Sequence, residues 1–280
     1  MNAPLVETNI AEALAWARKR IQPHEARLLL RHICRTSAAL LAAWPEKNLA
    51  ISQWEDFQHL VGRRATGEPI AYLTGEREFY GRAFLVNASV LIPRPETELL
   101  IELAVARFSA VFRPKVLDLG TGSGVLAVTL ALELDHPEIT AIDASRDALA
   151  VATSNALRHH AGISFLWSDW YASLKREDRF QLIVSNPPYI VENDPHLTQG
   201  DLRFEPLAAL ASGRDGLCAL TTIIAGASRH LKNDGWLFLE HGYNQATAVR
   251  GLLADAGFAN IASWKDIAGI ERVSAGCWTG

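Results

Sequence analysis

The chain has 280 residues, of which 49% are hydrophobic, enough to fill the core of one large domain and a small one. Its formal net charge of −4 argues against a protein that holds nucleic acid mainly through phosphates, because such proteins carry a clear basic excess. No apolar run reaches the roughly 18 residues of a membrane-spanning helix.

The start of the chain and its cysteines indicate a cytoplasmic protein without a metal site. Met1 to Asn9 lack the basic patch and the apolar stretch of a secretion signal. Cys34, Cys218 and Cys277 lie far apart and form no CxxC pair, so we expect neither a disulfide framework nor bound zinc. We interpret all three as small buried apolar side chains.

Residues 1–74 are predicted to form a small helical domain. Apolar side chains recur there at helical spacing, at Ile10, Leu14 and Ala17 and again at Leu28, Leu29, Ile33 and Leu40. Residues suited to helix starts precede such runs: Thr8 or Asn9, Pro23, Ser37 and Ser52.

Residues 75–94 are predicted to form a β-hairpin linker. They follow the breakers Gly67, Pro69 and Gly75. Aromatic and aliphatic residues then flank a turn at Gly81, with Phe79 and Tyr80 before it and residues 84–86 after it.

Residues 95–280 alternate strands with helices, the pattern of a mainly parallel α/β sheet covered on both faces. We expect strands at 116–119, 139–143, 163–167, 180–185, 236–240, 261–264 and 272–278. We expect helices from Gly124, from Arg146, and over 217–231 and 246–256.

A glycine-rich turn joins the first of these strands to its helix. Gly120, Thr121, Gly122, Ser123 and Gly124 follow the strand and let a ligand approach the backbone closely. Similar turns serve dinucleotides, but here the third glycine comes one residue early for GxGxxG. Asp118, inside the strand, suits a cationic ligand with an ammonium and a sulfonium better than a pyrophosphate. The turn therefore favours S-adenosylmethionine.

The next two strand ends supply candidate cofactor contacts. Asp143 stands where a carboxylate accepts the ribose hydroxyls of an adenosine; it could instead cap the next helix, but Ser145 or Ala144 can do so. Asp169 and Trp170 can hydrogen-bond and pack against an adenine ring, although Trp170 could equally be core.

The turn Asn186-Pro187-Pro188-Tyr189 follows the fourth strand, at the crevice where strand order should reverse. The two prolines hold Asn186 and the local carbonyls in place. If the Asn186 side-chain oxygen and the Pro187 carbonyl accept the N–H bonds of an amide or exocyclic amine, that nitrogen gains electron density and is aimed at a methyl group. Tyr189 would stack on the planar group. The plain alternative is an ordinary turn after a strand.

With these motifs in hand, the chain resembles the release-factor glutamine N5-methyltransferases, the PrmC or HemK family. The likeness spans both predicted domains. It includes four further segments similar to family segments: Gly67 to Gly75, Leu91 to Glu98, Arg203 to Pro206 and Gly269 to Arg272.

The resemblance implies a seven-stranded class I (Rossmann-like) methyltransferase domain at 95–280, preceded by a helical substrate-docking domain and the hairpin linker. It implies S-adenosylmethionine bound by Gly120 to Gly124, Asp143, Trp170 and Asn186. The substrate would be the glutamine of the Gly-Gly-Gln loop of class 1 peptide release factors, methylated by in-line displacement. Asn186 to Tyr189 would clamp its amide, with Arg94 and the rest of Pro93 to Glu98 lining the pocket. No strong general base is needed, and His241 is only a minor candidate.

Two other functions stay open. A DNA or RNA methyltransferase of the adenine-N6 type would present the same planar N–H pair to the Asn186 turn. The acidic catalytic domain and the lack of a Lys/Arg-rich base-reading segment stand against it. A non-catalytic binding protein with this fold would show damaged motifs, whereas the glycine turn, Asp143 and the Asn186 turn are intact.

Asn186→Ala should abolish turnover, because the acceptor that orients the substrate nitrogen is lost. Cofactor binding, measured by calorimetry, should fall far less than turnover. Wild-type turnover in this variant would contradict the clamp.

Overall fold

The computed structural model describes residues 8–280, so the prediction made for Met1 to Asn9 lies largely outside the described residues. Internal contacts divide the chain into two units. The N-terminal unit runs to Gly75 and also contains Gly200–Phe204. The second unit contains Glu76–Gln199 and Glu205–Gly280.

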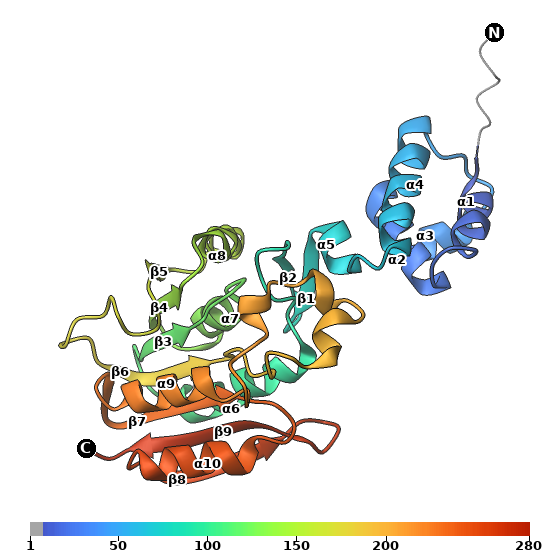
Figure 1. Cartoon of the computed structure of the whole chain (residues 1–280). Coiled ribbons are helices and arrows are strands. Elements are labelled where there is room, and N and C mark those ends of the chain that lie inside the picture. Colours follow the sequence, from blue (N-terminus) through green and yellow to red (C-terminus); the bar gives the residue numbers. More distant parts are fainter. Residues whose placement is uncertain (1–7) are drawn as a thin grey trace. The chain divides into compact units, whose positions relative to one another are not determined.

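Helices build the N-terminal unit (Figure 1): α1 (Ile10–Ala17), α2 (Pro23–Cys34), α3 (Ala38–Ala43), α4 (Ile51–Ala65) and α5 (Ile70–Thr74). The predicted starts at Asn9, Pro23 and Ser37 are confirmed, since the Asn9 and Ser37 side chains cap α1 and α3 and Pro23 opens α2. Ser52 is wrong as a start, because it lies inside α4.

The core of this unit follows the predicted helical spacing only in part. Ile10, Leu14 and Ala17 are buried on α1. On α2 the buried stripe is Ala26, Leu29 and Leu30, and Leu28 is 41% exposed. Leu40 is 53% exposed because its neighbour Leu41 takes the core position instead.

One ion pair and one hydrogen bond hold Gly200–Phe204 in the same unit. The Arg64 guanidinium lies 2.7 Å from Glu25 and 3.0 Å from Asp201. Arg203 donates a hydrogen bond to the carbonyl of Thr66. Gly67 has φ +100°, a backbone conformation that other residues rarely adopt, so this position favours glycine.

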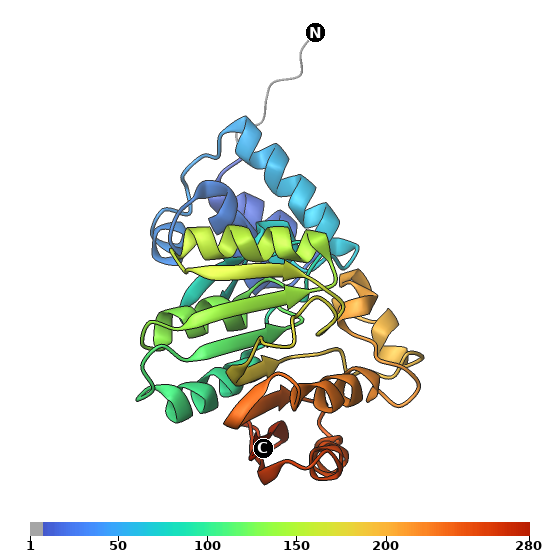
Figure 2. The same cartoon turned by 90° about the vertical axis from the view of Figure 1, so that its left-hand side faces the viewer.

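The second unit is built on a seven-stranded sheet. Figure 2 shows its parallel strands side by side, from β5 (yellow) through β4 and β3 (green) to β6. The order is β5-β4-β3-β6-β7-β9-β8, and β9 runs antiparallel to both β7 and β8. The strands are β3 (Lys115–Leu119), β4 (Glu138–Asp143), β5 (Ile163–Trp167), β6 (Phe180–Ser185), β7 (Leu231–Glu240), β8 (Ala259–Lys265) and β9 (Glu271–Trp278). The seven-stranded α/β fold is confirmed.

Helices cover both faces of the sheet: α6 (Glu98–Phe108), α7 (Val125–Glu133), α8 (Arg146–Arg158), α9 (Cys218–Ala227) and α10 (Ala246–Asp255). Alternate strand residues point to opposite faces. Val116 of β3 packs in the core cluster with α6 and α7, whereas Leu117 packs in the cluster with α9 and α10. Figure 1 shows α9 and α10 on the near side of the sheet.

The hairpin β1 (Glu76–Phe79) and β2 (Arg82–Leu85) packs into the core of this unit through Phe79 and Phe84. The buried Asn155 of α8 ties its end in place. Its side chain exchanges two hydrogen bonds with the Leu85 backbone, of 2.7 and 2.9 Å, and donates a third to the carbonyl of Ser123 at 2.8 Å. One side chain therefore joins the hairpin to the glycine turn.

Some sequence predictions are wrong. The helix expected over 217–231 ends at Ala227, because the chain turns and the carbonyl of His230 accepts a hydrogen bond from Phe180 of β6. The sequence did not single out α6. Of the cysteines, Cys277 is buried, Cys34 is half-buried and Cys218 is exposed at the start of α9.

Gly124→Ala should destabilise the protein more than Gly122→Ala. Both glycines have positive φ, +83° and +54°, so both variants are strained. Only at Gly124 would the new Cβ crowd a neighbour, with Ala152 Cβ at 3.1 Å and Cα at 3.2 Å; nothing lies within 4 Å at Gly122. Denaturant unfolding without cofactor measures both losses, and equal losses would contradict this packing argument.

Candidate functional site

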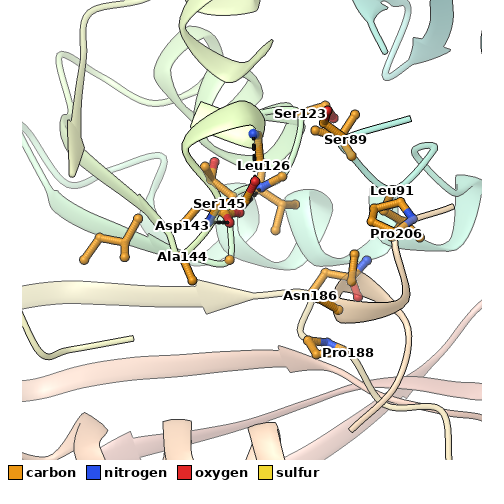
Figure 3. Close-up of a pocket in the computed structure, with 18 of the residues that line it drawn as sticks. Ser89, Leu91, Ser123, Leu126, Asp143, Ala144, Ser145, Asn186, Pro188 and Pro206 are labelled. Atoms are coloured by element: carbon orange, nitrogen blue, oxygen red, sulfur yellow. Dashed lines mark hydrogen bonds between the residues drawn. The ribbon is translucent and has the colours of Figure 1, made fainter. Parts of the chain in front are cut away.

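A cavity of about 380 Å³ opens at the carboxyl ends of the parallel strands (Figure 3). Its size is typical of small-molecule sites. Four strand ends contribute to its wall: Gly120 to Ser123 after β3, Asp143 to Ser145 at β4, Ser168 to Trp170 after β5, and Asn186 and Pro188 after β6. The strand order reverses at β3, as the sequence predicts for a ligand crevice.

Backbone hydrogen bonds fold the glycine turn over the end of β4. The amides of Gly120 and Thr121 both donate to the carbonyl of Ile142, at 2.8 and 2.9 Å. Gly124 then caps α7 in the left-handed region, with φ +83°. The turn thus lines the cavity with Gly120, Thr121, Gly122 and Ser123.

Asp118 lies beneath this turn and does not line the cavity, so it does not face a ligand as the sequence suggested. Its Oδ2 accepts hydrogen bonds from the Thr121 hydroxyl at 2.6 Å and from the Ala127 amide at 3.2 Å. The latter satisfies a first-turn amide of α7, whose cap Gly124 has no side chain. Burial raises the pKa of Asp118 to about 7, and these hydrogen bonds limit the rise.

Asp143 lines the cavity and also shapes it. Its two oxygens accept from the amides of Gly122 at 2.9 Å and Ser145 at 2.8 Å. Ser145, not Asp143, caps α8, because its hydroxyl accepts from the Ala148 amide. Burial raises the pKa of Asp143, while the backbone hydrogen bonds oppose that shift. Each carboxylate oxygen keeps a further lone pair for a ligand hydroxyl.

Asp169 and Trp170 both line the cavity, and Asp169 is exposed. Trp170 serves the core as well: it packs against the cluster that includes α9, and its ring lies over Gly120. Its φ of +46° is unusual for a tryptophan and turns the chain at this point.

The turn after β6 divides into two parts. Asn186 and Pro188 line the cavity, and Figure 3 shows Asn186 near Leu91 and Pro206. Pro187 and Tyr189 do not line it. Tyr189 packs against the core, and its carbonyl accepts from the Gln245 side chain at 3.1 Å. Its predicted stacking on a substrate stays a prediction.

A buried carboxyl group lies behind this turn. Glu240 ends β7 and is 1% exposed, and Tyr189 donates to its Oε1 at 3.2 Å. Asn186 Nδ2 donates to the hydroxyl of Thr97 at 3.0 Å, and Thr97 in turn hydrogen-bonds Glu240. Burial raises the pKa of Glu240 to about 7; hydrogen bonds from Thr97 and Tyr189 oppose the rise.

Arg94 and His241 lie outside the cavity lining. The Arg94 guanidinium pairs with Glu205, whose other oxygen accepts from the Ile92 amide at 3.0 Å. This pair joins the segment before Arg94 to the segment after Glu205, and both segments line the cavity. A contact of Arg94 with substrate stays a prediction. His241 is fully buried and hydrogen-bonded to the Gly242 carbonyl and the Ser274 hydroxyl, which is a structural role.

Several site residues escaped the sequence analysis. Residues Ser89 to Leu91 and Ala208 to Ala209 line the cavity from irregular segments, which carry no periodic signal. Glu240 could have been found, because it ends a buried apolar strand just as Asp143 does.

Within residues 8–280, no group of three or more metal-binding side chains occurs, and no helix is long and apolar enough to cross a membrane.

Comparison with known proteins agrees with this geometry. Residues 95–201 match the family "Methyltransferase small domain" and residues 12–75 match "PrmC N-terminal domain". Release factor glutamine methyltransferases from Bordetella pertussis and Burkholderia pseudomallei are 48% and 49% identical, each over 90% of this chain and over 93% and 90% of their own lengths. A methyltransferase from Pyrococcus furiosus shares the fold, with a TM-score of 0.54 and 14% identity, over 78% of this chain and 98% of its own. The chain therefore belongs to the release factor glutamine methyltransferase family.

Proposed function

We propose that this protein transfers a methyl group from S-adenosylmethionine to the side-chain amide nitrogen of the glutamine in the Gly-Gly-Gln loop of class 1 peptide release factors. The observation that carries the proposal is the position of Asn186, an amide acceptor in the wall of a cavity that begins at the glycine turn. The close similarity to release factor glutamine methyltransferases supports the choice of substrate.

The cavity residues fit S-adenosylmethionine. A Cβ on Gly122 would meet nothing within 4 Å, so the turn leaves space beside its backbone. Asp143 offers acceptors for the ribose hydroxyls, and Trp170 offers an apolar face with Asp169 beside it. When bound, the cofactor supplies an electrophilic methyl group on a cationic sulfur.

Orientation of the substrate nitrogen is the task of the protein. An amide nitrogen is a poor nucleophile because its lone pair is delocalised into the carbonyl. The Asn186 side-chain oxygen would accept a hydrogen bond from the amide, increase the electron density on its nitrogen and direct it toward the methyl group. The Pro187 carbonyl, which does not line the cavity, stays the predicted second acceptor. The amide proton leaves to water, so no strong base is required.

The remaining assignments are parts of the same proposal. The N-terminal helical unit would dock the release factor, and Arg94 would contact it near the pocket entrance. Methylation of a release factor, which acts in translation, agrees with the cytoplasmic location expected from the sequence.

Asp143→Ala should weaken S-adenosylmethionine binding on the order of 10- to 100-fold, because it removes the ribose acceptor and releases the Gly122 and Ser145 amides. Calorimetric titration measures the loss. Asp147→Ala is the matched control, because Asp147 is an exposed carboxylate in the first turn of the following helix, α8, and does not line the cavity; this variant should bind as the wild type does. Equal affinity in the Asp143 and Asp147 variants would refute the ribose contact.

The substrate assignment can be tested with labelled cofactor and purified substrates. Label should reach a class 1 release factor and should not reach the same factor with Gln→Ala in its Gly-Gly-Gln loop. DNA and rRNA serve as further arms. Label on nucleic acid but not on release factor would overturn the proposal.

A further inference from the structure

Hydrogen bonds connect Asn186 to a buried carboxyl group through residues far apart in the sequence. Asn186 Nδ2 donates to Thr97 Oγ1 at 3.0 Å, and the Thr97 hydroxyl hydrogen-bonds Glu240. Tyr189 approaches the same carboxyl group and donates to its Oε1 at 3.2 Å. Thr97 is 2% exposed and Glu240 is 1% exposed, so bulk water does not compete for these bonds.

The direction of each bond follows from the number of protons available. Two hydroxyl groups converge on Glu240, and its ionised carboxylate can only accept from both. Thr97 has a single hydroxyl proton and gives it to Glu240, so its oxygen can only accept from Asn186. The side-chain nitrogen of Asn186 therefore donates to Thr97, and the side-chain oxygen of Asn186 stays free to accept a hydrogen bond from a ligand.

We propose that Thr97 is a positioning residue that fixes the orientation of the Asn186 amide, and that Glu240 fixes the hydroxyl of Thr97. The inference rests on the proposed function, in which the Asn186 oxygen accepts an N–H bond of the substrate. An Asn186 side chain rotated by half a turn would point its own N–H bonds at the substrate N–H bonds. Two donors would then face each other.

Protonation of Glu240 at Oε2 does not reverse this order. Burial raises the pKa of Glu240 to about 7; Thr97, Tyr189 and Arg272 lower it, whereas Glu96 adds to the rise. Its Oε2 has no hydrogen-bond partner within residues 8–280. A proton that binds to Oε2 leaves Oε1 available as an acceptor.

Thr97→Val tests the inference, because it keeps the shape of the side chain and removes the hydroxyl. We expect kcat on release factor to fall on the order of 10- to 100-fold, while KM for S-adenosylmethionine stays within about twofold. Thr97→Ser keeps the hydroxyl and should restore most of kcat. Turnover of Thr97→Val within about twofold of the wild type would overturn the inference.

Thr129→Val is the matched control. Thr129 is fully buried on α7, and its hydroxyl has no hydrogen-bond partner in the described part of the chain. The same substitution there should leave kcat unchanged. A comparable loss in Thr129→Val would show that the Thr97 effect is one of packing, and would count against the inference.

Unfolding measurements test the contact without any turnover. Thr97→Val, Asn186→Ala and the double variant form a cycle, and the double variant should lose less stability than the sum of the single losses. Additive losses would overturn the inference whether or not the release factor is methylated. Absence of label on release factor in the wild-type protein would count against the proposed function instead.

Discussion

The parallel pairing of β3 with both β4 and β6 is the constraint on which the site depends. Leu119 at the end of β3 is opposite Ile142 of β4 and opposite Ser185 of β6. The three strands therefore end at one level, and the segments that follow them start beside each other. A slip of one residue in either pairing would turn Asp143 or Asn186 to the other face of the sheet.

Acidic side chains gather along this edge of the sheet, where each is held by a neighbour. Asp118, Asp143 and Glu240 end or nearly end their strands, and burial raises the pKa of all three. Backbone amides at the start of α7 and α8 supply partial positive charge against the first two. Of the three, only Asp143 lines the cavity, so it is the carboxyl group of this edge that can meet a ligand directly.

The sequence predicted those parts of the site that follow a regular strand. The strand ends near 119, 143 and 185 follow from hydrophobic runs, and the glycine turn and Asn186 follow them directly. It could not predict Thr97 as the partner of Asn186, because 89 residues separate them and only the packed sheet brings them together. The helix expected over 217–231 was too long for a similar reason. Pairing of His230 with Phe180 is a tertiary contact that local propensity does not contain.

Because of the segment Gly200–Phe204, the chain passes between the two units three times. The chain leaves the N-terminal unit after Gly75, returns to it at Gly200, and leaves it again after Phe204. A single cleavage after Gly75 would therefore divide the N-terminal unit between two fragments. A chain cut back to begin at Glu76 would keep Asp201 and Arg203 but lose Arg64 and Thr66, their partners. The sequence that follows Gly75 thus encodes the methyltransferase unit together with a segment of the N-terminal unit.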